Sequence, residues 1–194
     1  LSAISGSHDI IPAVIEFVDI AGLVEGAASG EGLGNKFLAN IRETDMIGQV
    51  VRIFEDEDIH HVAGRIDPRG DIEVINLELV LADAETVEKR LGNVERDAKR
   101  GDKDAVIERD LLVRLKQHLA DGLLANQLEM NEDEQKAVKQ LHLLTMKPFL
   151  YICNKKHGGM NLDDQSDERW HALLDFFDFT GAEYVVVDAG MEHE

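Results

Sequence analysis

Two residues near the start of the chain, Asp19 and Gly22, have the types and the spacing that phosphate chemistry uses. The apolar run at residues 13–18 predicts a β-strand that ends directly before Asp19. A carboxylate at such a strand end can hold a water molecule on Mg²⁺, and the Gly22 amide can donate to a phosphate oxygen. The D-x-x-G pattern therefore indicates a phosphate and Mg²⁺ site. A plain turn is the alternative, because two of the four positions are wildcards.

The segment after Asp19 is rich in glycine. Its glycines are Gly22, Gly26, Gly30, Gly32 and Gly34. Backbone without a Cβ can approach a ligand closely, which is how many α/β proteins hold phosphate groups. A helix-like segment follows. We therefore interpret residues 22–34 as one loop of a nucleotide site.

The remaining elements predict an α/β fold with a mainly parallel sheet. Short apolar runs at residues 47–54, 149–153 and 184–187 are typical of buried parallel strands. Helical patterns separate them, including one at residues 169–177, as crossover connections require.

A long helical hairpin is predicted between the second and third strands. An apolar seam with alternating steps of three and four residues indicates a coiled coil. It comprises Leu77, Val80, Ala84, Val87, Leu91, Val94 and Ala98. A turn near Gly101 breaks the seam, and Ala105, Leu112, Leu115 and Leu119 resume it, with Glu108 as a misfit. A further helix is predicted at residues 131–144. We expect residues 71–144 to be a helical insertion between the two parts of the sheet domain, residues 1–70 and 145–194.

The composition limits the classes of function. The 194 residues carry a net charge of −19, which disfavours sequence-blind binding of nucleic acid over the whole surface. No apolar run approaches the roughly 20 residues of a membrane span. Cys153 is the single cysteine, so no intrachain disulfide can form and a reducing cytoplasm is the expected location.

The motifs together resemble the YchF family of Obg-related ATPases. The resemblance rests on the run DIAGLVEGAASGEGLGNKFLANIRE, on the GDK turn at residues 101–103 and on LTMKP at residues 144–148. It extends over about residues 10 to 192. It implies a P-loop NTPase domain interrupted by a coiled-coil hairpin, with ATP or possibly GTP as substrate, Mg²⁺ as cofactor and ribosomes or RNA as partners.

The resemblance also implies an unusual catalytic residue. Leu23 occupies the position where many GTPases carry a water-orienting glutamine, and leucine can neither donate nor accept a hydrogen bond. The family instead uses a histidine on another loop, which corresponds here to His61, next to His60. The alternative is an exposed histidine beside the acidic residues 55–58.

The base-reading motif departs from the family pattern. GTP-specific relatives carry N-K-x-D and the YchF family carries N-x-x-E, whereas this chain has Asn154-Lys155-Lys156-His157. A neutral imidazole cannot reproduce the paired acceptance of a carboxylate. The loop that should lie beside the base includes Ala189. We therefore expect Asn154, His157 and Ala189 at the base, and the choice between ATP and GTP stays open. A common polar turn is the alternative for Asn154-Lys155.

A phosphate-cradling G-x-x-x-x-G-K-[ST] loop is not present in these 194 residues. The nearest sequence, residues 30–37, has Asn35 in place of the second glycine and Phe37 in place of the hydroxyl residue. The sequence is therefore expected to be a fragment that lacks the P-loop and the family's terminal TGS domain, and to be inactive alone. The alternative is a degenerate module that does not hydrolyse nucleotide and acts through its hairpin. The sequence predicts no oligomeric state.

Overall fold

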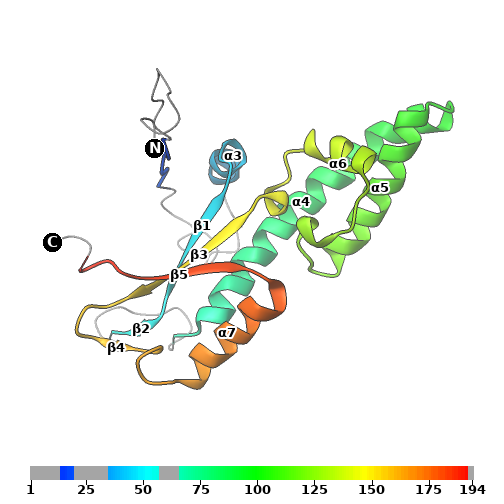
Figure 1. Ribbon diagram of the computed structural model, residues 1–194. Helices are drawn as coiled ribbons and strands as arrows, with labels where there is room; N and C mark the ends of the chain where they lie inside the picture. Colours follow the sequence, from blue (N-terminus) through cyan, green and yellow to red (C-terminus); the bar gives the residue numbers. More distant parts are fainter. Residues whose placement is uncertain (1–13, 20–34, 57–65, 192–194) are drawn as a thin grey trace, which may run out of the picture.

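The computed structural model describes residues 14–19, 35–56 and 66–191. A three-stranded parallel sheet of order β1-β3-β5 forms its centre. Helices α4 and α7 pack against one face of this sheet, and α4 continues away from it into a long hairpin with α5 (Figure 1). The predicted α/β class with a helical hairpin is confirmed.

The sheet consists of β1 (Ile47–Arg52), β3 (Phe149–Lys155) and β5 (Glu183–Asp188). In register, Val51 lies opposite Cys153, which lies opposite Val186. Tyr151 and Cys153 point to the covered face, where they pack with residues of α4 and α7. The strands at residues 149–153 and 184–187 were thus predicted nearly to their observed ends.

One predicted strand is divided in two. Residues 47–54 form β1 and then β2 (Phe54–Glu55), which pairs antiparallel with β4 (Met160–Asn161). Ile53 lies between them. Its amide donates to the Asn154 carbonyl at 3.1 Å and its carbonyl accepts from the Leu162 amide at 2.8 Å. The apolar pattern extends past β1 because Ile53 and Phe54 are buried as well.

Helix α4 (Pro68–Lys99) begins at the N-cap Asp67, whose side chain accepts from the Gly70 amide. Its 32 residues span about 48 Å. The first part packs under the sheet through Ile72, and the later part pairs with α5. Helix α7 (Glu168–Thr180) covers the same face of the sheet and ends at Gly181 with a positive φ of 65°.

The hairpin has its own core between α4 and α5 (Lys103–Ala120). The seam positions Val80, Val87, Val94 and Ala98 are buried, as predicted. Leu77 is 52% exposed, so its assignment to the seam is wrong. The seam begins only where α5 lies alongside, and Leu77 precedes that region.

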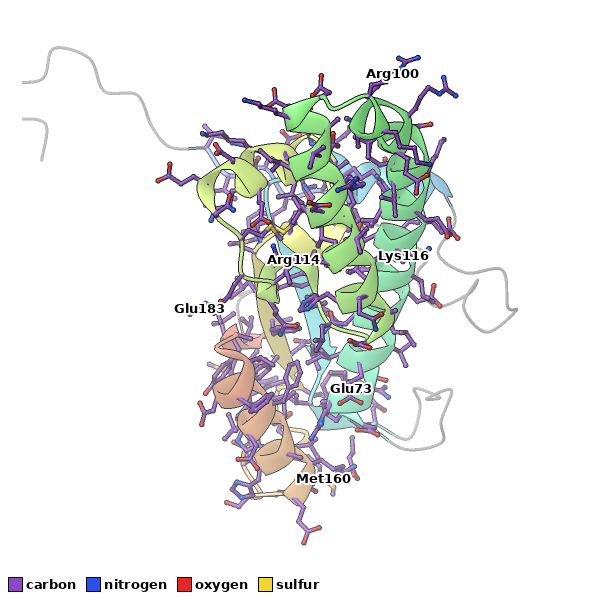
Figure 2. All side chains as sticks on the ribbon, turned by 90° about the vertical axis from the view of Figure 1, so that its right-hand side faces the viewer. Glu73, Arg100, Arg114, Lys116, Met160 and Glu183 are labelled. Carbon is purple, nitrogen blue, oxygen red and sulfur yellow. The ribbon has the colours of Figure 1, made fainter. Side chains whose placement is uncertain are left out.

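The hairpin turn follows from the sequence, whereas the contact of Glu108 does not. Gly101 adopts a φ of 86°, which favours glycine, and Asp102 caps α5 by accepting from the Ala105 amide at 3.0 Å. The misfit Glu108 receives two hydrogen bonds from Arg90 on α4, at 2.6 and 2.9 Å. Figure 2 shows Arg100 at the hairpin end and Met160 at the opposite end of the molecule.

The return from the hairpin is more broken than predicted. The helix expected at residues 131–144 is α6 (Glu132–Lys139), with a capping box between Asn131 and Glu134. Two 3₁₀ turns flank it, η1 (Ala125–Gln127) and η2 (Leu144–Met146). His142 has a φ of 48°, which a continuous helix cannot contain.

The first predicted strand is not realised. Residues 14–19 have no regular secondary structure and belong to neither sheet. Val14, Ile15 and Phe17 are at least 79% exposed. A strand needs a paired neighbour for its backbone groups, and none lies beside this segment within the described residues. Residue 13 lies outside them. Helix α3 (Asn35–Glu43) precedes β1 and packs through Ile41 against Leu79 and Leu144.

A buried carboxylate joins the hairpin to the sheet. Asp83 on α4 is fully buried and accepts from the amides of Leu144 and Thr145 at 2.8 Å each and from the Thr145 hydroxyl at 2.7 Å. Burial raises the pKa of Asp83, and these hydrogen bonds act in the opposite direction.

Among the described helices, none is long and apolar enough to cross a bilayer.

The Asp83→Ala variant should lose about 3 kcal/mol of unfolding free energy, because two amides and a hydroxyl lose their buried acceptor. Urea unfolding followed by circular dichroism measures this. The exposed Glu85→Ala on the same helix is the control and should change stability by less than about 0.5 kcal/mol. Equal stability of the two variants would contradict the role of Asp83.

Candidate functional site

The carboxyl ends of the three parallel strands meet at one edge of the sheet. Arg52, Asn154 and Val187 lie side by side in register there, and Lys155 lies opposite Asp188. In open α/β sheets, ligands bind outside the carboxyl ends of the strands. The edge that carries Asn154 is therefore where the fold itself predicts a ligand.

Asn154 has an unused polar atom at this edge. Its side-chain Oδ1 is buried and has no hydrogen-bond partner in the described structure. Its backbone carbonyl is occupied by Ile53. Buried polar groups without partners are rare, and at a sheet edge they point to a ligand or water.

The two lysines after Asn154 are both paired with acids. Lys155 Nζ lies 2.8 Å from Asp163 and 2.7 Å from Asp164, and these contacts raise the pKa of Lys155. Lys156 Nζ lies 2.6 Å from Asp56. Neither ammonium group is therefore free of a carboxylate partner.

Asn161 closes the loop between β3 and β4. Its side-chain oxygen accepts from the Lys156 amide at 2.9 Å, and its amide group donates to the Lys156 carbonyl at 3.2 Å and to Asp164 at 3.0 Å. The bond to Asp164, together with the stronger one from Lys155, lowers the pKa of that carboxyl group. The position of His157 is therefore set by a loop with its own internal hydrogen bonds.

His157 lies against the loop that follows β5. Its Nδ1 is 3.4 Å from Oδ2 of Asp188. The other oxygen of Asp188 accepts from the amides of Gly190 and Met191, at 3.1 and 3.2 Å. The predicted Ala189 belongs to this same loop and is exposed. The structure thus brings Asn154, His157 and Ala189 to one edge.

Of the other predicted site residues, the structure describes Asp19. Asp19 ends an exposed segment outside the sheet and makes no hydrogen bond or ion pair with the other predicted residues in the described structure. Seven predicted residues lie outside the described residues: Gly22, Leu23, Gly26, Gly30, Gly32, Gly34 and His61. Their assignments stay predictions.

Sequence reasoning missed the residue that holds the two loops together. The sequence predicts that the loop with Ala189 lies beside the base, but it does not predict that Asp188, directly before Ala189, contacts His157. The signal was available, since an acidic residue directly after an apolar run of a parallel strand lies at the carboxyl edge. No such signal was available for the pairing of Lys155 with Asp163 and Asp164. This pairing depends on the path that the chain takes between β3 and α7.

Comparison with known proteins tests the family resemblance. The ribosome-binding ATPase YchF of Bacillus subtilis is 49% identical over 184 residues, which cover 95% of this chain and 50% of the relative. That of Haemophilus ducreyi is 51% identical over the whole chain and 52% of the relative. The resemblance to the YchF family is confirmed. No family model matches the chain.

A solved structure supports the same relationship. The YchF GTPase of Schizosaccharomyces pombe superimposes with a TM-score of 0.69 at 29% identity, over 89% of this chain and 47% of that one. The P-loop NTPase class is therefore supported by structure as well as sequence. The chain spans about half the length of the YchF relatives that it matches.

The Cys153 thiol on β3 should be unreactive in the folded chain. It is fully buried, and burial together with the charge of Asp163 raises its pKa to about 12. The thiolate is the reactive form of cysteine. Alkylation by iodoacetamide at about pH 8 should therefore be roughly 100-fold slower in buffer, where the chain is folded, than in urea. Mass spectrometry over time measures both rates, and comparable rates would contradict the burial of this thiol.

Proposed function

We propose that the chain forms part of the nucleotide site of a YchF-related hydrolase that cleaves ATP, or possibly GTP, with Mg²⁺ and associates with ribosomes. The observation that supports this most is the convergence of Asn154, His157 and Asp188 at the carboxyl edge of a parallel sheet. The named activities of the relatives agree with it.

The phosphate end of the site is assigned by sequence. Asp19 would hold a water on Mg²⁺ and Gly22 would meet the terminal phosphate, with the glycines of residues 26–34 forming a switch loop. No group of three or more potential metal-ligating side chains occurs among the described residues. Proteins hold Mg²⁺ through one or two carboxylates together with substrate phosphates and waters. The bound ion would neutralise charge on the phosphates.

The roles of the two parts of the chain follow from this proposal. Residues 1–70 and 145–194 would belong to the nucleotide-binding domain, and residues 71–144 would form the inserted arm. The arm has a hydrophobic core of its own, and ion pairs between its helices, such as Lys116 with Glu88 at 2.7 Å, line its surface. This separate core and charged surface favour the second candidate function, a non-hydrolysing module that binds a partner through the hairpin.

The purified 194-residue chain should release phosphate from ATP or GTP no faster than buffer, because it contains no P-loop sequence to supply amide donors and a Mg²⁺ hydroxyl ligand. A malachite-green assay with Mg²⁺ measures this, and cosedimentation with ribosomes tests the partner. Mg²⁺-dependent turnover well above the blank would refute the prediction. Strong cosedimentation that nucleotide does not alter would favour the second candidate.

In a longer protein that joins this sequence to a G-x-x-x-x-G-K-[ST] loop, His61→Ala should lower kcat by about 100-fold or more while leaving nucleotide affinity nearly unchanged. The reason is that His61 would act on the attacking water and not on the bound nucleotide. Single-turnover hydrolysis and equilibrium binding separate the two effects. His60→Ala is the matched control, and equal turnover of the two variants would remove His61 from the mechanism.

A further inference from the structure

Strand β1 lies at one edge of the sheet, with β3 as its single neighbour among the described strands. An edge strand presents backbone N–H and C=O groups with which another strand can pair, and proteins commonly protect such edges with proline, lysine or a bulge. The sequence of β1, IGQVVR, contains neither proline nor lysine, and Val50 is 66% exposed. Within the described structure, this edge is therefore open to an added strand.

The sheet face that α4 and α7 leave uncovered is apolar beside this edge. Val50, Ile152 and Val185 lie side by side in register on that face. The next residues along the two inner strands, Val51 and Cys153, are buried on the opposite face. A strand added next to β1 would lengthen the row that starts at Val50 and would cover part of it.

Residues 14–19 of the same chain have the composition of a strand but lie outside both sheets. Valine, isoleucine and phenylalanine favour strands. Val14, Ile15 and Phe17 are at least 79% exposed, and Val18 is 52% exposed. Single exposed apolar side chains are ordinary, whereas a contiguous group of them marks an interaction site. The chain thus carries both an open sheet edge and an apolar segment outside the sheet.

The two segments match residue by residue in a parallel register. In this register apolar residues lie beside apolar residues, polar beside polar, and the one acid at the end beside the one base. The pairs are Val14 with Ile47, Ile15 with Gly48, Glu16 with Gln49, Phe17 with Val50, Val18 with Val51 and Asp19 with Arg52. A shift by one or two residues in either direction sets a carboxylate beside a valine. Side-chain matching therefore selects one register.

Arg52 supplies the charge that this register uses. Its guanidinium lies 5.7 Å from the centre of the Phe54 ring, and it forms no ion pair with the residues that the structure describes. A carboxylate beside it would meet an uncompensated cation. The net charge of −19 opposes association of two copies, but at about 0.15 M salt this long-range repulsion is screened beyond roughly 8 Å.

We propose that two copies of this chain exchange residues 14–18, each copy adding them as a parallel strand to the β1 edge of the other. Two such contacts would bury roughly 1,000 Å² of segment surface besides the edges that receive it, which is the size that a specific interface needs. The exchange does not depend on nucleotide binding. It would place Asp19 of the partner subunit at the same carboxyl edge as Asn154.

The first test is sedimentation velocity of the full chain from about 2 to 200 µM in about 0.15 M NaCl. The chain should be dimeric at the upper end of this range. Phe17→Ser removes the central apolar contact, and Val50→Lys places a charge on the receiving edge. Each should weaken the dimer about ten-fold or more. A chain that stays monomeric at every concentration would overturn the proposal.

Each variant has a matched control elsewhere on the surface. Phe179→Ser on α7 matches Phe17→Ser, because the two phenylalanines are 92% and 86% exposed. Val113→Lys on α5 matches Val50→Lys, because Val113 is 53% exposed. Both controls should leave the dimer unchanged, and circular dichroism checks that all four variants are folded. Equal weakening by the controls would overturn the proposal, since association would then not depend on these two segments.

A charge exchange shows whether the strand comes from the other copy. Asp19→Arg and Arg52→Asp should each weaken self-association about ten-fold, because each puts like charges side by side. In a one-to-one mixture of these two variants, both contacts of a mixed dimer join opposite charges again. The mixture should therefore associate about as tightly as the unaltered chain. Residues 14–18 that paired with β1 of their own chain would stay mismatched on mixing, and failure of the mixture to associate would overturn the proposal.

Discussion

The buried carboxylate of Asp83 is the interaction on which the arrangement of this molecule depends. A charged side chain with no exposure is tolerated only when donors surround it, and η2 supplies three. The Thr145 hydroxyl that donates to Asp83 also accepts from the Ala125 amide at 3.0 Å. One carboxylate thus fixes α4, η1 and η2 to each other, where the chain leaves the sheet and where it comes back.

This junction lies beside the elements that lead to the candidate site. Arg42 at the end of α3 donates to Thr86 on α4 at 3.1 Å, and Lys147 donates to the carbonyls of Arg42 and Thr44. The Pro148 carbonyl, directly before β3, accepts from the Ile47 amide at 3.0 Å. The hairpin, the helix after the glycine-rich segment and the strand that ends at the candidate site therefore share one set of contacts. In a close-packed interior, displacement of one of these elements must be accommodated by the others.

The carboxyl edge follows a different principle. Ion pairs hold the loops of this edge in place. Two polar groups there are available to a ligand, namely the unpartnered Oδ1 of Asn154 and the exposed imidazole of His157. Proteins tend to break local rules of polar satisfaction at functional sites. The edge of the sheet shows this pattern, whereas the Asp83 junction satisfies its buried carboxylate with three donors.

The sequence by itself determined the elements whose signals are local. Periodic apolar residues predicted β3, β5, α7 and the hairpin, and Gly101 with Asp102 predicted its turn, because side-chain periodicity and backbone preference act over a few residues. The same signals placed Asn154 at the end of a strand. The resemblance to the YchF family added the expectation that His157 and Ala189 lie near it. Local signals could not show that residues 14–18 would lie outside both sheets of the described structure, that the run at 47–54 would serve two sheets, or that Leu77 would lie outside the seam. Only the tertiary structure decided those points, together with the burial of Asp83 and the contact of His157 with Asp188. Each of these features depends on a segment that is distant in sequence and adjacent in space. The free energy of a buried charge, or of a strand, depends on whether that neighbouring segment supplies hydrogen-bond partners.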